Sequence, residues 1–129
     1  MAGTLTIATL SDGTNSTSST NCIQGSAKAW VQYNAVSQAI LASYNVSSVT
    51  YSAAGQYVVN FTNAFADTKY AVTGCAGGAT SAVGDNSAAI LNIKQNSADS
   101  VSTGFVRIKV GYSDGTAVSY PYNSIAIFR

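Results

Sequence analysis

Five aspartates are the only acidic side chains of this 129-residue chain, which has no histidine and no glutamate. A Ser-His-Asp or Cys-His arrangement requires histidine, and glycosidase chemistry requires two carboxyl groups flanking the scissile bond. Each aspartate stands at a turn-like position, where a short carboxylate accepts hydrogen bonds from its own backbone. They are Asp12, Asp67, Asp85, Asp99 and Asp114. We therefore expect no catalytic residues and a protein that is not an enzyme.

Metal and cofactor motifs are equally weak. Residues 12–15 (Asp-Gly-Thr-Asn) and 114–116 (Asp-Gly-Thr) resemble fragments of calcium loops, but such loops gather several oxygen ligands, usually with more than one carboxylate. The Gly-rich segment 74–84 lacks the GxxxxGK[ST] order that holds a phosphate. Cys22 and Cys75 match no zinc spacing. Two buried thiols are the favoured interpretation and a Cys22–Cys75 disulfide is the alternative, so we expect no metal and no cofactor.

Large apolar and aromatic side chains remain as candidates for binding. The chain has one tryptophan and eight tyrosines, which bury large areas in cores and interfaces. A cluster of exposed tyrosines could instead stack on sugars. The candidate interaction residues are Trp30, Tyr33, Ile40, Leu41, Tyr112 and Tyr120.

The charge of the chain limits its partners. Charged residues make up 9% of the chain, compared with about 25% in an average protein, and the net charge is +1. The six basic residues are scattered along the sequence, which argues against nucleic acid. No segment approaches the roughly 20 apolar residues of a membrane span, and residues 1–10 lack the features of a signal peptide. A surface with so few charges tends to associate, so we expect a homo-oligomer without membrane insertion.

Alternating apolar residues and turn signals predict strands along most of the chain. The clearest pair is a hairpin, 46–51 and 56–62, around the turn Ser52-Ala53-Ala54-Gly55. Segment 27–33 has apolar groups on both faces, so we expect it to be covered on two sides. The other expected strands are 4–10, 38–44 (a strand or bent connection), 70–75, 88–95, 104–112 and 123–128. This pattern predicts an all-β fold, an antiparallel β-sandwich or short barrel of about seven or eight strands.

The N-terminal region differs from the rest in composition. Residues 11–20 (SDGTNSTSST) are polar and of low complexity, without an apolar anchor, and we expect them to be flexible when alone. The sequence therefore predicts a polar, extended N-terminal arm at residues 1–21 that lies on a neighbouring subunit. A single β-sandwich domain follows at residues 22–129.

Several segments together resemble a repeated theme in tail-fibre and other virion proteins of marine and cyanobacterial phages. They are 27–31 (AKAWV), 44–50 (YNVSSVT), 57–62 (YVVNFT), 70–72 (YAV) and the C-terminal 125–129 (IAIFR). Two segments depart from the sequence that is usual in this family. Residues 34–38 (NAVSQ) replace a polar Asn-Gly-Thr segment, and Ile40-Leu41-Ala42 replaces an arginine-bearing strand. Small or apolar residues at these places favour burial against another subunit.

The resemblance implies a non-enzymatic structural protein on the surface of a virion. Within that class we expect a capsid decoration (cement) protein whose arm extends along neighbouring capsid subunits. The alternative is the receptor-binding tip of a tail fibre or other appendage, contacting host-surface glycans through loops such as 77–86 or 113–120. A trimer is the oligomer that the family suggests, and other capsid or tail subunits would be the partners.

Overall fold

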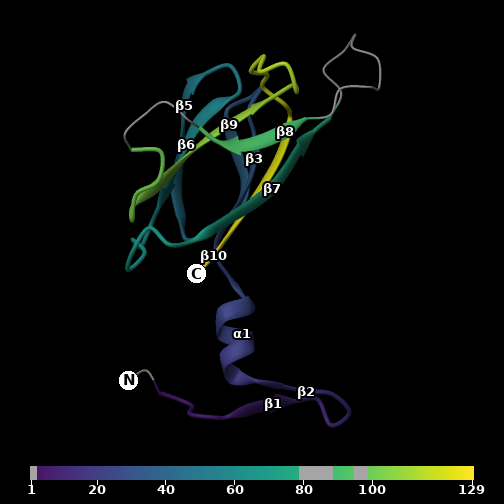
Figure 1. Cartoon of the computed structure of the whole chain (residues 1–129), viewed down its shortest axis with the longest axis vertical. Coiled ribbons are helices and arrows are strands. Elements are labelled where there is room, and N and C mark those ends of the chain that lie inside the picture. Colours follow the sequence, from purple (N-terminus) through teal and green to yellow (C-terminus); the bar gives the residue numbers. More distant parts are fainter. Residues whose placement is uncertain (1–2, 79–88, 95–98) are drawn as a thin grey trace.

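Eight strands form two antiparallel sheets of four strands, packed face to face (Figure 1). This computed structural model describes residues 3–78, 89–94 and 99–129. The first sheet has the strand order β4-β3-β10-β7 and the second has the order β5-β6-β9-β8. The predicted all-β class is confirmed, in its sandwich form. The strands are β3 (Ala27–Asn34), β4 (Ala39–Tyr44), β5 (Val46–Ala53), β6 (Gln56–Phe61), β7 (Ala71–Gly77), β8 (Ile90–Ile93), β9 (Phe105–Gly111) and β10 (Tyr122–Phe128).

The core lies between the sheets because alternate side chains of each strand point inward. In β9, Val106, Ile108 and Val110 are completely buried, while Arg107 and Lys109 between them are not. Strand β10 repeats this pattern, with Ile125 and Ile127 facing the core. Each strand thus presents a second, outward row of side chains, and these outward rows are where partners can bind.

The predicted hairpin is confirmed, with a tighter turn than the sequence suggested. Strand β5 extends to Ala53, which pairs with Gln56, so only Ala54 and Gly55 form the turn. Gly55 has a φ of +63°, and a Cβ there would lie 2.2 Å from the carbonyl oxygen of Val110. The backbone N–H of Val110 donates to the Gly55 carbonyl at 2.7 Å. Glycine is therefore required by both conformation and space.

One buried polar residue connects the two sheets. Asn123 of β10 is completely buried, and its Oδ1 accepts from the hydroxyl of Tyr57 in β6 at 2.7 Å. Its Nδ2 donates to the carbonyls of Tyr33 (3.0 Å) and Tyr120 (2.7 Å). All three bonds have normal lengths, so this amide is well satisfied. Burial, and secondarily the nearby Tyr33 phenol, raises the pKa of Tyr57.

The N-terminal arm is more ordered than its composition suggested. It contains a hairpin of β1 (Thr9–Ser11) and β2 (Ser16–Ser18), followed by α1 (Ser19–Gly25), and projects away from the sandwich (Figure 1). The short polar side chains supply local hydrogen bonds: Asp12 Oδ1 accepts from the N–H groups of Thr14 (2.9 Å) and Asn15 (2.7 Å). Ser18 caps α1 through the N–H of Asn21. Turn and cap residues thus replace the expected flexible segment.

Other expectations need correction. The expected strand 4–10 is limited to β1 from Thr9, and the expected boundary between residues 21 and 22 falls inside α1. The segment 27–33 is a strand covered on one side only, because Trp30 and Gln32 face outward and are exposed. Segment 38–44 is a strand, β4. The expected 74–84 loop is β7 up to Gly77, and the rest of it, like Asp85, lies outside the described residues from position 79 onward.

The cysteines are free thiols rather than a disulfide. Cys22 lies in α1 and is half-buried, whereas Cys75 lies in β7 and is exposed. The expectation of two buried thiols is therefore wrong. Cys75 pairs with Ser124 on the outward row of the first sheet, since the neighbouring Ala76 occupies the inward row.

Candidate functional site

Three of the aspartates, Asp12, Asp67 and Asp114, accept hydrogen bonds from nearby backbone N–H groups, and Asp67 also binds the side chain of Arg129. Asp12 and Asp114 accept from N–H groups two or three residues further on, and these bonds lower the pKa of each carboxyl. Asp67 binds the guanidinium of Arg129, whose Nε lies 2.8 Å from Oδ1, and this partner lowers the pKa of Asp67. Among the described residues, no three His, Cys, Asp or Glu side chains gather as a metal site would require.

No helix in the described part of the chain is long and apolar enough to cross a membrane.

Two surfaces remain as candidate binding sites, and the first is the arm. None of the seven residues of α1 is buried. Leu5 is 82% exposed and Ile23 is 64% exposed, and Ile7 and Leu10 are also exposed. These four side chains, with Cys22, line an open hollow of about 420 Å³ between the N-terminal segment and α1. Asp12 is the single charged residue between Gly3 and Ala27. The arm therefore presents an apolar, nearly uncharged surface.

The second surface is the outward face of the first sheet, on β3, β10 and β7. A groove of about 580 Å³ runs across it, and we call this the outer groove. Trp30, 40% exposed, stands beside it, opposite Tyr44 on β4 and Ala126 on β10. None of the lining residues is charged: Trp30, Gln32, Thr73, Cys75, Ser124 and Ala126 form most of it. Its chemistry is thus one large aromatic ring with neutral hydrogen-bonding groups beside it.

The structure divides the predicted interaction residues into two groups. Trp30, Ile40 and Leu41 are exposed, the last two on edge strand β4. Tyr33 and Tyr120 are in the core, with 1% and 6% of their surface exposed, so they cannot belong to an exposed binding surface.

Tyr33 is buried because it shares the inward row of β3 with Ala29 and Val31. Tyr112 is half-buried, and its ring packs edge-on against Tyr120 at 6.5 Å between centroids. The two tyrosines next to the 113–120 loop therefore hold it against the core. Neither projects freely from it.

Sequence reasoning missed two groups of surface residues. The apolar side chains of the arm, such as Leu5 and Ile23, look like ordinary core residues in the sequence, and only their lack of a partner makes them notable. Three basic residues, Lys94 just after β8 with Arg107 and Lys109 in β9, are separated in sequence and become neighbours through strand pairing, as considered below. The alternation of Arg107 and Lys109 was the one sequence signal that pointed to them.

Comparison with known proteins identifies no relative. No family model matches the chain, and no curated protein or solved structure matches it. The surfaces described above are therefore the structural basis for a functional interpretation.

Proposed function

We propose that this protein is a non-enzymatic structural component of a phage virion, a capsid decoration protein that is attached through its arm and displays its sandwich outward. The observation that carries the proposal is that the apolar side chains of the arm, including Leu5 and Ile23, remain largely exposed in the described structure. The sequence resemblance of segments within residues 27–72 to virion proteins suggests that the assembly to which the arm attaches is a phage particle. Capsid subunits, and further copies of this chain, are the proposed partners.

The small size of the arm elements supports a requirement for a partner. An isolated helix shorter than about 12–15 residues is marginal in water, and α1 has seven residues. A lone two-stranded hairpin is also marginal, and β1 and β2 have three residues each. Burial of a Leu or Ile side chain contributes about 1.5–3 kcal/mol. Docking the exposed apolar side chains on a neighbouring subunit would therefore stabilise both the arm and the assembly that it binds.

Oligomerisation follows from the same surface. Because Asp12 is the one charged side chain of the arm, copies of the arm can pack together with little like-charge repulsion. In a homo-oligomer, for which we expect a trimer, the apolar hollows of the arms would be buried against one another. Closed symmetric assemblies are the usual outcome when a chain binds its own copies.

The test is binding to particles purified from the phage that encodes the chain. A protein lacking residues 1–26 should lose particle binding while its sandwich melts as before. The substitution Ile23→Ser should weaken binding, whereas Val36→Ser, at an equally exposed position of the sandwich, should not. Retained binding after arm deletion, or equal loss in both substitutions, would contradict attachment through the arm.

A receptor-binding tip on a tail appendage is the second candidate, and the outer groove favours it. An exposed tryptophan beside neutral amide and hydroxyl groups suits the apolar face and hydroxyls of a sugar. For this function, Trp30→Ala should reduce adsorption to host cells with no effect on particle assembly. Counting copies per virion by quantitative mass spectrometry separates the candidates, because a decoration protein is present across the capsid and a tip only at appendages.

A further inference from the structure

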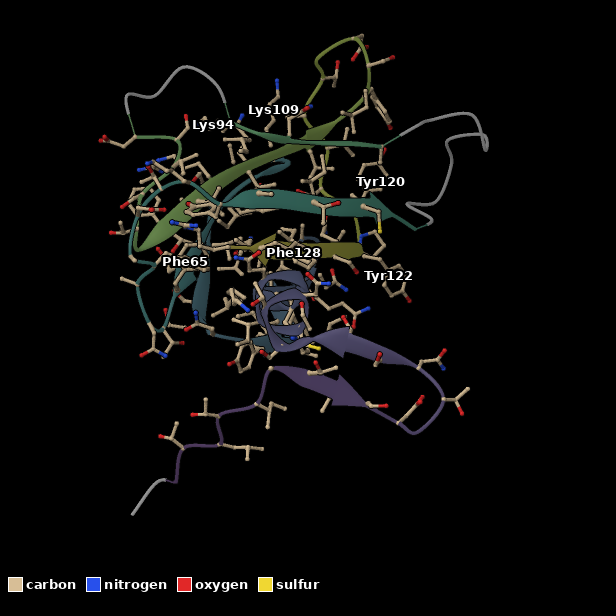
Figure 2. The ribbon with its side chains drawn as sticks, turned by 60° about the horizontal axis from the view of Figure 1, so that its bottom comes forward. Phe65, Lys94, Lys109, Tyr120, Tyr122 and Phe128 are labelled. Atoms are coloured by element: carbon tan, nitrogen blue, oxygen red, sulfur yellow. The ribbon has the colours of Figure 1, made fainter. Side chains whose placement is uncertain are left out.

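Three basic side chains lie together on the outward face of the second sheet. They are Lys94, just after β8, with Arg107 and Lys109 in β9, half of the six lysines and arginines of the chain. Figure 2 shows Lys94 and Lys109 side by side on the side of the sandwich away from Tyr122 and Phe128. We call these three residues the cationic face. The basic residues are scattered along the sequence, but the fold brings these three of them together.

Strand pairing brings the three residues together. Ile93 pairs with Ile108, and the backbone N–H of Lys94 donates to the carbonyl of Arg107 at 2.8 Å, so Lys94 lies opposite Arg107. Lys109 lies opposite Asn92, on the same side of the sheet. Val106, Ile108 and Val110 point into the core, which leaves the basic residues pointing outward. Side chains directly opposite in an antiparallel pair have Cβ atoms about 4.5–5.5 Å apart.

Such an arrangement is unfavourable unless an anion is present, because like charges placed opposite each other destabilise a sheet. The carboxylates in the described part of the chain do not neutralise it. The ion pair found there joins Arg129 to Asp67, and Asp114 accepts a backbone N–H. Asp99 contacts Arg107 through its backbone carbonyl and forms no ion pair with it. Within the described residues, Lys94 Nζ has no hydrogen-bond or ion-pair partner. The charges therefore face solvent without a counter-ion from these residues.

Two of the side chains are also held in place. Arg107 Nε donates to the carbonyl of Asp99 at 3.1 Å, and the guanidinium stacks over the ring of Phe105, 5.1 Å from its centre. Lys109 Nζ donates to the carbonyl of Gly115 at 2.9 Å. Each of these bonds uses one donor of the group and leaves others available. Holding a side chain before binding reduces the conformational entropy that binding must remove.

We propose that the cationic face binds an acidic polysaccharide through its carboxylate or sulfate groups. Gln56 and Asn92, the partners of Lys109 on the two neighbouring strands, are neutral and polar, which suits sugar hydroxyls, whereas Val58 opposite Arg107 is apolar. Asn92 is exposed on β8, and Asn60 of β6 contacts the hydroxyls of Ser48 and Thr50 at 3.0 Å. This site is on the opposite sheet from the outer groove and does not depend on attachment through the arm.

Nucleic acid fits this face less well. Proteins that bind single strands supply aromatic rings on which bases stack. The ring of Phe105 is already covered by Arg107, and Trp30 and Tyr122 belong to the other sheet. Binding of duplex DNA generally uses six or more phosphate contacts, roughly twice what three cations offer.

The experiment measures binding of the full chain to immobilised dextran sulfate, alginate and neutral dextran at low ionic strength. We expect binding to one or both acidic polymers and none to dextran, with affinity that falls as salt is added. The stronger of the two acidic probes identifies sulfate or carboxylate as the preferred group. Absence of binding to both, or equal binding to dextran, would overturn the proposal.

Matched variants separate a specific site from overall charge. Lys94→Gln with Lys109→Gln should weaken binding about tenfold, since it removes two charge-assisted contacts. Lys28→Gln with Lys69→Gln removes the same charge from outside the cationic face and should change affinity less than about twofold. Equal losses in the two double variants would show attraction by net charge alone. Tighter binding of single-stranded DNA than of either acidic polymer would also reject the proposal.

Discussion

Ile108 in β9 and Ile23 in α1 are the same kind of residue in opposite situations. Ile108 is completely buried between the sheets, whereas Ile23 is 64% exposed on the arm. The sandwich buries its apolar side chains within the chain and satisfies its central amide with three hydrogen bonds. The arm has local caps and a turn, but its apolar side chains remain exposed.

This difference separates the part of the molecule that buries its apolar side chains within the chain from the part that leaves them exposed. Local hydrogen bonds can specify the shape of a hairpin or a helix, but burial supplies most of the stability of folded elements. The sandwich has local hydrogen bonds and buried apolar side chains, whereas the arm has local hydrogen bonds alone. The comparison therefore supports assembly as the role of the arm.

The largest effect should come from Ile108→Ala. The substitution removes three side-chain carbons from a fully buried position and leaves a cavity, which costs about 2–5 kcal/mol of unfolding free energy. Urea denaturation followed by tyrosine and tryptophan fluorescence measures this loss. A loss below about 1 kcal/mol would mean that the sandwich is not held by the packing described here.

A slightly smaller effect is expected for Asn123→Ala, which tests the polar connection between the sheets. The substitution leaves the Tyr57 hydroxyl and the carbonyls of Tyr33 and Tyr120 without this partner. We expect a loss of about 3 kcal/mol in the free energy of unfolding, because each unsatisfied buried group costs about 1–3 kcal/mol. Tyr57→Phe should cost less, and a double-mutant cycle isolates the energy of their hydrogen bond. A cycle that gives no coupling would contradict this contact.

Alkaline pH should weaken the sandwich through Tyr57. Burial raises the pKa of Tyr57 above its ordinary value of 10, so above pH 10 the unfolded chain loses this proton more readily than the folded one. The free energy of unfolding then falls with rising pH, by at most about 1.4 kcal/mol per pH unit for one group. Denaturation at pH 8 to 11 should show this fall, and Tyr57→Phe should reduce its slope. An unchanged slope in the variant would assign the fall to other tyrosines.

The smallest effect on unfolding is expected for Ile23→Ala, the counterpart of Ile108→Ala. An exposed side chain contributes little to stability, so we expect a change below about 0.5 kcal/mol in the free energy of unfolding. The same substitution should reduce self-association, measured by analytical ultracentrifugation, because it removes part of the apolar surface of the arm. A large loss of sandwich stability would show that the arm belongs to the core, and unchanged self-association would remove Ile23 from the interface.

Much of the sandwich could be predicted from the sequence because its strands follow simple local rules. Alternation in 104–112 places Val106, Ile108 and Val110 on one face and Arg107 and Lys109 on the other, and the structure has the same division. The turn before Gln56 and the strand after Pro121 were also marked by turn residues. The same reasoning failed in the arm, since seven residues are too few for a periodic pattern and no residue of α1 is buried.

The local sequence is enough to assign side chains to the faces of most strands, to place most turns, and to exclude histidine and glutamate chemistry. Which strands are neighbours, and in what register, depends on the tertiary fold. That choice placed Lys94 opposite Arg107, put Tyr33 and Tyr120 in the core, and left Trp30 beside an open groove. The physical reason is that alternation is a property of one strand, whereas pairing and sheet packing depend on contacts between residues far apart in the chain.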